Sequence, residues 1–389
     1  MFMWLVALGL IIFVLTPAVL SQIVERSMNK TRGKKKYYSV RGEAAALHSR
    51  LFIVDLHADT LLWNRNILMR HGYGHVDLPR LVEGNVAMQV FGVVTRVPAG
   101  QNFESNRADS GDLLVPLTIV QGWPIRTWKS PLRRALYQAE KLEWFAANAR
   151  GRQFMLIRNQ QDIDELLQRR AQNPVIVGGF PALEGAHALE GRVANLDLLY
   201  DAGFRMFGLS HFFDNEACGS AHGVEKGGLT PFGEEVVHRV MAKNMILDLA
   251  HASEQTIDDV LDITDKVPVV VSHTGVRGTC DNQRNLKDDH IKRIAAYGGV
   301  IGIAIFDTAI GETSVEAAAK AMRYTADLAG VDCVAFGSDF DGTVVTPIDA
   351  SGIVQLTDAL MSQGFSEEDI YKIMGGNFLR ICRAILPKA

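Results

Sequence analysis

The sequence has few cysteines, few prolines and no excess of positive charge, and each shortage excludes a class of protein. Its four cysteines lie far apart and form no C-x-x-C pair, which disfavours a disulfide scaffold or a zinc ribbon and fits a reducing compartment. Twelve prolines against 35 glycines exclude a collagen-like or proline-rich chain. A formal net charge of −4 argues against a nucleic-acid-binding protein that relies on bulk electrostatics.

The composition of the 389 residues is otherwise typical of a globular protein. Hydrophobic residues make up 48% and charged residues 22% of the chain, which excludes disorder over its whole length. The length allows two domains, or one large α/β barrel with insertions. The charge is distributed unevenly, because residues 1–40 carry a net +5 and the other 349 residues carry −9. The leader and the acidic body are therefore analysed separately.

The leader resembles a membrane anchor. Residues 1–24 hold no charged side chain, and an apolar stretch of about 20 residues is long enough to span a bilayer. Basic residues follow this stretch instead of preceding it, and no Ala-x-Ala site is present, so a transmembrane anchor is favoured over a cleaved signal peptide. A wrongly assigned start codon is a third alternative. We expect residues 25–45 to be a basic linker, and residues 46–389 to be the body.

The side of the membrane on which the body lies stays open. Lys34, Lys35 and Lys36 follow the apolar stretch and weakly favour a cytoplasmic body. The same lysines would also contact anionic head groups of either leaflet.

Eight short apolar runs alternate with amphipathic stretches along the body. Alternation of strand and helix predicts a parallel sheet, and eight repeats predict an α/β fold of the (β/α)8, or TIM-barrel, type. The expected strands are residues 52–56, 87–94, 175–180, 206–209, 246–249, 269–271, 300–305 and 334–336.

The stretch from about residue 95 to 173 has no strong signal for a parallel strand. It holds a polar loop and two helical patterns, at residues 132–149 and 161–170. We expect it to be an insertion between the second and third strands that covers the mouth of the barrel. A small subdomain on the side of the barrel, away from any site, is the alternative.

Acidic and imidazole side chains follow five of the eight expected strands. In such a barrel, catalytic residues lie at the carboxyl ends of the strands, so these side chains should meet on one rim. Imidazole nitrogens and carboxylate oxygens suit zinc or a similar divalent metal. One catalytic zinc needs about three protein ligands, so the set is large enough for two ions and one further acid. Its members are His57, Asp59, Glu184, His251, His273 and Asp339.

Seven motifs make the body similar to the membrane dipeptidase (renal dipeptidase) family of zinc metallopeptidases. The resemblance extends from about residue 51 to residue 386 and depends on both the order and the spacing of the motifs. They are VDLHADT (54–60), PALEGAHAL (181–189), GLSHFFDN (208–215), LDLAHAS (247–253), VSHTGVRG (271–278), RNLKD (284–288) and GSDFDG (337–342).

The resemblance implies a role for each matching residue. His57, Asp59 and a bridging Glu184 would hold one zinc ion, and Glu184, His251 and His273 would hold a second. Asp339 would carry the proton between a metal-bridging hydroxide and the leaving amine. Two residues would bind the substrate: His211, which would stabilise the oxyanion, and Arg284, which would bind the carboxylate of a dipeptide.

Other interpretations of single residues stay open. His211 could cap a strand end, and Arg284 could pair with Asp281 or Asp288 at the surface. Asp341 fits a turn or a partner of a ligand better than a ligand. His187, three residues after Glu184, either orients that carboxylate or is a plain loop residue. His71 and His75 are expected to be non-ligands, and surface or packing roles are expected for His48, His222, His238 and His290. Gly298 and Gly299 are expected to form a turn and not a phosphate cradle.

The sequence differs from the animal members of that family, which are secreted, lipid-anchored and disulfide-bonded. It has an N-terminal apolar segment and no convincing cysteine pair, so it is similar to a bacterial-type member. We therefore expect a dipeptidase tethered to the bacterial inner membrane, with zinc as cofactor, dipeptides as substrates and no nucleic-acid partner. A homodimer is the candidate assembly. The alternatives are a barrel hydrolase for another amide, lactam or ester, and a non-catalytic binding protein.

Overall fold

A ring of eight parallel strands forms the centre of the computed structural model, which describes residues 19–32 and 39–388. Each strand pairs in parallel with its neighbour in the order β10-β9-β8-β7-β6-β5-β3-β2. The strands are β2 (Ile53–Ala58), β3 (Val86–Val94), β5 (Val177–Glu184), β6 (Met206–Gly208), β7 (Ile246–Asp248), β8 (Val270–Thr274), β9 (Val300–Ile303) and β10 (Val334–Phe336).

The ring is nearly closed where its first and last strands meet. Ala58 forms an isolated parallel bridge with Phe340, just beyond β10. The backbone N–H of Asp339 donates to the His57 carbonyl (3.1 Å), and that of Asp59 donates to the Phe340 carbonyl (2.8 Å). These bonds bring the segments that carry His57, Asp59 and Asp339 side by side. The near-closed α/β barrel confirms the predicted TIM-type fold.

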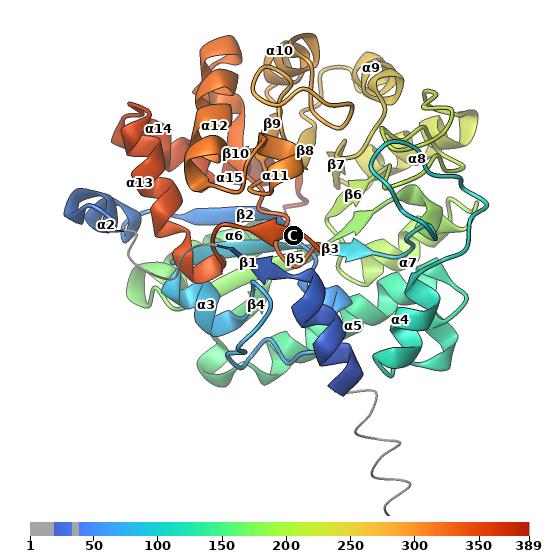
Figure 1. Cartoon of the computed structure of the whole chain (residues 1–389), viewed down its shortest axis with the longest axis horizontal. Helices are drawn as coiled ribbons and strands as arrows, with labels where there is room; N and C mark the ends of the chain where they lie inside the picture. Colours follow the sequence, from blue (N-terminus) through green and yellow to red (C-terminus); the bar gives the residue numbers. More distant parts are fainter. Residues whose placement is uncertain (1–18, 33–38, 389) are drawn as a thin grey trace, which may run out of the picture.

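Helices surround the strands on the outside of the ring (Figure 1). Several begin after a Ser or Thr whose side chain accepts a backbone N–H, for example Thr230 before α8 and Ser253 before α9. The helices are α2 (Gly42–His48), α3 (Leu78–Glu83), α4 (Leu114–Val120), α5 (Pro131–Asn148), α6 (Gln160–Gln172), α7 (Asn195–Asp201), α8 (Pro231–Ala242), α9 (Glu254–Ile263), α10 (Asp288–Ala296), α11 (Asp307–Ile310), α12 (Val315–Ala329), α13 (Val354–Ser362), α14 (Glu367–Tyr371) and α15 (Asn377–Ile385).

The barrel strands are buried on both faces, as expected for a parallel sheet covered by helices. The last helix, α15, packs under the barrel at the amino ends of the strands. Asn377 at its start donates to the carbonyl of Val334, the first residue of β10 (2.8 Å). Phe378 stacks near Phe180 of β5. The amino end of the barrel is thus filled with side chains, and the carboxyl end is free to hold a site.

Between β3 and β5 the chain forms α4, α5 and α6, in the region where the sequence predicted an insertion near 95–173. The two helices predicted there correspond to α5 and α6. The stretch also holds a strand that gave no strong signal in the sequence: β4 (Phe154–Leu156) pairs in parallel with β5 outside the ring. With three residues, β4 is too short to produce a clear pattern in the sequence.

The N-terminal segment lies against the body. The predicted anchor, residues 1–24, falls outside the described residues except for 19–24, which belong to a helix over residues 19–28. The predicted linker 25–45 also has structure, because β1 (Lys30–Thr31) pairs with β11 (Val345–Thr346). Among the residues that the structure describes, no helix has the length and apolar character needed to cross a bilayer. The membrane tether, the inner-membrane location and the homodimer stay predictions.

Candidate active site

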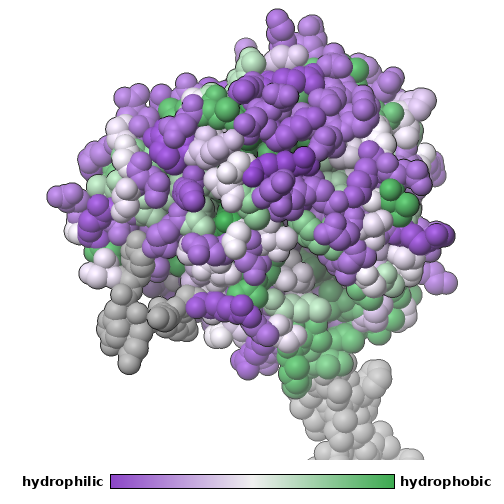
Figure 2. All heavy atoms as spheres, turned by 45° about the horizontal axis from the view of Figure 1, so that its top comes forward, coloured by the Kyte–Doolittle hydropathy of each residue, from purple (hydrophilic) through white to green (hydrophobic). Residues whose placement is uncertain are grey.

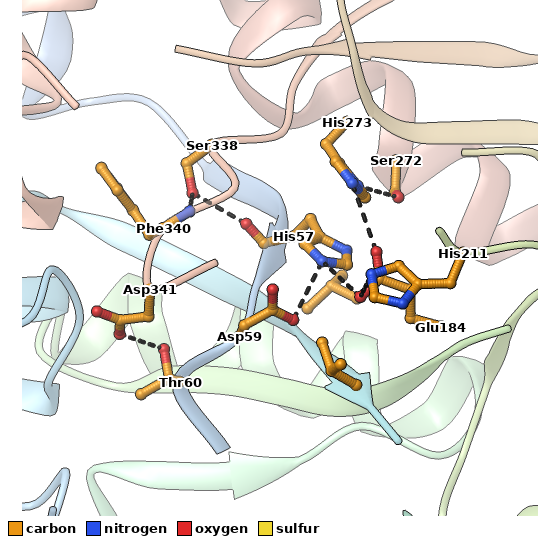
Figure 3. A network of polar contacts seen from close by, with 12 residues as sticks. His57, Asp59, Thr60, Glu184, His211, Ser272, His273, Ser338, Phe340 and Asp341 are labelled. Atoms are coloured by element: carbon orange, nitrogen blue, oxygen red, sulfur yellow. Dashed lines mark hydrogen bonds and ion pairs between the residues drawn. The ribbon is translucent and has the colours of Figure 1, made fainter. Parts of the chain in front are cut away.

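The side chains predicted to bind metal meet at the carboxyl end of the barrel (Figure 3). Glu184, the last residue of β5, lies at their centre and presents its two oxygens to different partners. Its Oε2 lies 3.8 Å from His57 Nε2, and its Oε1 lies 3.0 Å from His251 Nε2 and 3.6 Å from His273 Nε2. Asp59 Oδ1 lies 3.3 Å from His57 Nε2. All five side chains are buried.

Asp339 joins this cluster from the segment after β10. Donor atoms of His57, Asp59 and Asp339 lie within 4.8 Å of one another. Two further groups of donor atoms meet the same distance limit: His57 with Glu184 and His273, and Glu184 with His211 and His251. All the predicted metal ligands, together with Asp339 and His211, therefore lie in one connected cluster.

The backbone at this rim is held in conformations that L-residues rarely adopt. His251, Asp339 and Asp341 have φ values of 63°, 62° and 63°. A left-handed backbone at residues other than glycine is costly and persists where the surroundings enforce it, often at functional sites. The neighbouring strand β3 also adapts to the site, because a Cβ at Gly92 would overlap Asp59 Oδ1 and His57 Nε2. Only glycine fits there.

The electrostatics of the site favour a bound cation. Burial, and then the charge of Asp59, raise the pKa of Glu184 well above its usual value and that of Asp339 to about 8. His57 is also buried, but Asp59 and Glu184 raise its pKa to about 10. The site therefore concentrates buried negative charge, which a divalent cation would compensate.

The donor atoms also fit a metal, because several of them are buried without a hydrogen-bond partner. These atoms include both ring nitrogens of His57, Asp59 Oδ1, Glu184 Oε2 and His251 Nδ1. Buried polar atoms are normally paired, so a group of orphans around one point indicates an unfilled ligand shell. For His251 and His273 burial is the main cause of pKa values well below the usual value, which keeps the rings neutral as metal binding requires.

A second layer of hydrogen bonds holds the ligands in place. Asp55, which is fully buried, accepts bonds from the backbone N–H of His57 (3.3 Å) and from the Ser338 hydroxyl (2.7 Å). Nδ1 of His273 lies 2.9 Å from the Ser272 hydroxyl. Such partners fix the orientation of metal ligands. The sequence analysis did not identify Asp55, although it precedes His57 by two residues and so shares its side of the strand.

A model of the membrane dipeptidase family, peptidase family M19, matches residues 41–387. The chain belongs to this family. Dipeptidase aclJ of Aspergillus oryzae is 26% identical over 354 residues, which are 86% of this chain and 78% of that protein. With this relative and the family match, the chain is a metallodipeptidase, and the alternative of a non-catalytic binding protein is wrong.

Solved structures of dipeptidases have the same fold. The structure of dipeptidase AC, a metallopeptidase of family M19, is 25% identical and has a TM-score of 0.70, over 87% of this chain and 99% of that one. A metallopeptidase from Rhodobacter sphaeroides, bound to a phosphinate mimic of L-Ala-D-Ala, is 24% identical with a TM-score of 0.70. That match covers 86% of this chain and 99% of the other.

Arg284 of this dipeptidase lies inside the mouth of the barrel and not in a surface ion pair. It is 6% exposed, and burial lowers its pKa to about 10. Its guanidinium donates to the carbonyl of His273 (2.6 Å) and to the hydroxyl of Thr274 (3.3 Å). No acidic side chain of the described residues forms a salt bridge with it. It lines a cavity of about 420 Å³ together with Asp59, Glu184 and Asp339.

His211 lines the same cavity, with its Nε2 3.6 Å from Glu184 Oε2. Its Nδ1 lies 3.3 Å from the carbonyl of Arg96, which can only accept a hydrogen bond. Burial lowers the pKa of His211 to about 4, so the ring is neutral and its proton is on Nδ1. This tautomer leaves Nε2 as an acceptor that could face a cation. The predicted role as oxyanion donor requires a proton on Nε2 and stays a prediction.

The predictions for three other histidines had different outcomes. His75 accepts a bond from the backbone N–H of Asp341 (2.9 Å), as expected for a non-ligand. His187 forms a hydrogen bond with the Thr95 hydroxyl (2.9 Å), which favours the interpretation as a packed loop residue over a partner of Glu184. His222 was expected at the surface or in packing, yet it lines the metal-side cavity and stacks on Phe212. Its position in the segment after His211, which lies within one of the seven motifs, was the available signal.

Proposed function

We propose that this metallodipeptidase is a dinuclear zinc enzyme that hydrolyses the peptide bond of dipeptides. The observation that carries the proposal is Glu184, whose two oxygens each face a separate set of donor atoms. His57 and Asp59 would complete one zinc site with Glu184, and His251 and His273 would complete the other. When bound, the two zinc ions would supply a hydroxide at neutral pH and polarise the scissile carbonyl.

Asp339 is proposed to carry the proton. Burial raises its pKa to about 8, so a carboxyl group here can hold a proton near neutral pH and release it. Its side chain lies close to Asp59 and His57, at the side of the cluster where the nucleophile would form. Asp339 would accept the proton of the nucleophile on a carboxylate oxygen and donate it to the leaving amine.

Arg284 is proposed to bind the terminal carboxylate of the substrate. The guanidinium is planar and matches a carboxylate with two parallel bonds. Its burial and the absence of an acidic partner among the described residues leave its charge available to a ligand in the cavity. A dipeptide held there by its carboxylate would place its peptide carbonyl near the metal ligands. The Rhodobacter relative, which binds a dipeptide mimic, is consistent with this substrate class.

The proposal is tested by metal analysis combined with a panel of dipeptides, dipeptide amides, lactams and esters. We expect two zinc ions per chain and hydrolysis of free dipeptides, with dipeptide amides much poorer because they cannot pair with Arg284. In Asp339→Asn we expect the same zinc content and a fall in kcat of about 10²–10⁴-fold. Asp281→Asn, which changes an exposed aspartate, is the matched control and should retain wild-type activity.

Four results would contradict the proposal. Full activity of Asp339→Asn would exclude its role in proton transfer. Equal rates on dipeptides and dipeptide amides would exclude the carboxylate site at Arg284, and preferred hydrolysis of a lactam or ester would favour the related barrel amidohydrolase. An active enzyme without bound metal would exclude the mechanism as a whole.

A further inference from the structure

A second cavity, of about 370 Å³, adjoins the metal-side cavity. The two share part of their lining, so they meet beside the metal ligands; the shared residues are Asp59, Gln101, His211, Phe212, Gly342 and Thr343. The rest of the lining is apolar. Figure 2 shows apolar atoms around a hollow at the lower edge of the molecule, on the side where Figure 1 places residues 19–28 and α4.

Three separate parts of the chain supply the apolar lining. The helix over residues 19–28 forms one wall, α4 and the residues before it form the opposite wall, and the residues around β2 and β3 form the floor. The helix contributes Leu20, Val24 and Met28. The segment of α4 and the residue before it contribute Leu113, Leu114, Pro116, Leu117 and Val120. The residues around β2 and β3 contribute Leu62, Trp63, Val94 and Val97. Among the described residues that line the cavity, only Asp59 and His211 at the junction can carry a charge.

The wall formed by residues 19–28 is fixed to the body by buried polar contacts. Glu25, which is 1% exposed, accepts a bond from Arg65 Nε (2.5 Å). The same guanidinium donates to Asp341, which follows Asp339 by two residues. The side chain of Asn29 accepts a bond from the backbone N–H of Thr343 (2.9 Å). The helix is thus part of the mouth of the barrel and shapes the cavity.

The position of Arg284 determines which end of a substrate reaches this cavity. Arg284 lines the metal-side cavity but not the apolar one. A dipeptide with its carboxylate on Arg284 and its carbonyl at the metal ligands would extend its N-terminal residue toward Asp59. That is where the apolar cavity opens.

We propose that the apolar cavity is a subsite for a large, uncharged side chain on the N-terminal residue of the dipeptide. This inference rests on the proposed function, because it uses the orientation that Arg284 gives the substrate. A cavity of about 150 Å³ holds a benzene ring, so 370 Å³ offers more room than a phenylalanine ring needs. The subsite therefore fits a long alkyl chain or a multi-ring aromatic group. Leu20 and Met28 are 41% and 44% exposed, so such a group can enter from outside.

A series of X-Gly dipeptides tests the subsite, with X as alanine, leucine, phenylalanine and 2-aminodecanoic acid. We expect kcat/KM of the full-length enzyme to rise by about fourfold for each methylene buried, the equivalent of about 0.8 kcal/mol. In Val24→Trp the indole would fill the cavity, so the ratio of the 2-aminodecanoyl rate to the alanyl rate should fall at least tenfold. Because this ratio is measured within one variant, a general loss of folding or activity cancels.

Ile23→Trp is the matched control, since Ile23 lies on the same helix, is 58% exposed and does not line the cavity. It should keep the wild-type ratio. A flat series in the wild-type enzyme, with normal hydrolysis of Ala-Gly, would overturn the subsite and leave the proposed function intact. An unchanged ratio in Val24→Trp would overturn it as well.

Calorimetry measures binding in the apolar subsite independently of peptide hydrolysis. Free 2-aminodecanoic acid should bind the wild-type protein with a negative heat-capacity change, and Val24→Trp should weaken this binding. If no dipeptide is hydrolysed but this binding is seen, the proposed function fails and the apolar subsite stands. If neither is seen, both fail.

Discussion

The mouth of the barrel has two walls of opposite character. The polar wall consists of acidic and imidazole side chains at the carboxyl ends of β2, β5, β7, β8 and β10. The apolar wall consists of the helix over residues 19–28 and α4, which are about ninety residues apart in the sequence. The polar wall carries the chemistry common to a peptide hydrolase, and the apolar wall determines which side chains can approach it.

The two walls also differ in how they are built. Each group on the polar wall lies in the last residues of a strand or within three residues after one, so the barrel alone brings the groups together. The apolar wall depends on contacts between distant segments, such as the bond from Arg65 to Glu25. The catalytic groups of this protein therefore lie in short sequence motifs, whereas the proposed selectivity depends on tertiary packing. Changes in the polar wall should therefore affect the rate of hydrolysis, and changes in the apolar wall should affect stability and substrate choice.

The largest effect is expected from Glu184→Gln on the polar wall. The two carboxylate oxygens of Glu184 face both sets of donor atoms, and the amide of glutamine lacks their negative charge. Both proposed metal sites would therefore lose a charged ligand. We expect fewer than one zinc ion per chain and a fall in kcat/KM of at least about 10³-fold, equivalent to about 4 kcal/mol. Metal analysis and hydrolysis of Ala-Gly measure both.

Glu316→Gln is the control for this change, because Glu316 is exposed at the start of α12, outside the site. This variant should bind as much zinc, and hydrolyse Ala-Gly as fast, as the wild type does. Retention of two zinc ions by Glu184→Gln would show that the carboxylate is not shared, and the polar wall would then need a different assignment.

The polar wall could be predicted from the sequence in large part. His57, Glu184 and His273 each end an apolar run, and their position after a strand predicts the side to which they point. The barrel was predictable for the same reason, since its strands are short apolar runs separated by amphipathic helices. Gly92 was not predictable, because it is required by the approach of His57 and Asp59 from the neighbouring strand. That requirement exists only in three dimensions.

The apolar wall was not predicted. The uncharged stretch 1–24 has the composition of an anchor, and nothing in it distinguishes residues 19–24, which lie against the body. Glu25 is the one acidic residue in the basic stretch 1–40, and the composition of that stretch gives no sign that Glu25 is buried on Arg65. Arg65 is itself 5% exposed and lies in a loop with no motif. Pairing between two such residues cannot be inferred from the composition around either one.

The second prediction tests this buried pair through pH. Arg65 forms ion pairs with two carboxylates, Glu25 and Asp341. Asp341 is buried, but the charge of Arg65, with smaller contributions from His75 and Thr60, keeps its pKa below the usual value. Burial raises the pKa of Glu25 to about 7, against the opposing charge of Arg65. Lys141, whose own pKa burial lowers to about 7, and Tyr73 are the other titratable groups facing it. The folded protein therefore holds a proton on Glu25 between about pH 4.5 and 7.

This proton makes stability depend on pH in a defined direction. The contribution of Glu25 is complete below about pH 4.5 and is lost as the pH rises through 7, by about 3 kcal/mol at most. Glu25→Gln removes the titration, so wild-type stability should fall relative to this variant between pH 5 and 7.5 in urea unfolding. Glu43→Gln, at an exposed position in α2, should show the wild-type pH dependence. Parallel pH profiles of wild type and Glu25→Gln would contradict the assignment.

The smallest effect is expected from Asn29→Ala, which removes a single contact between the two walls. The Asn29 side chain, 4% exposed, accepts the N–H of Thr343, a residue that lines both cavities. An unpaired buried N–H costs about 1 kcal/mol or slightly more, so the free energy of unfolding should fall by about that amount. Lys30→Ala, at the adjacent exposed position, should change the free energy of unfolding by less than about 0.5 kcal/mol.

Because Thr343 lies four residues after Asp339, hydrolysis of Ala-Gly by Asn29→Ala also measures the coupling of the walls. A change below about threefold would mean that the polar wall keeps its geometry without this contact, whereas a large loss would mean that the N-terminal segment positions the catalytic acid.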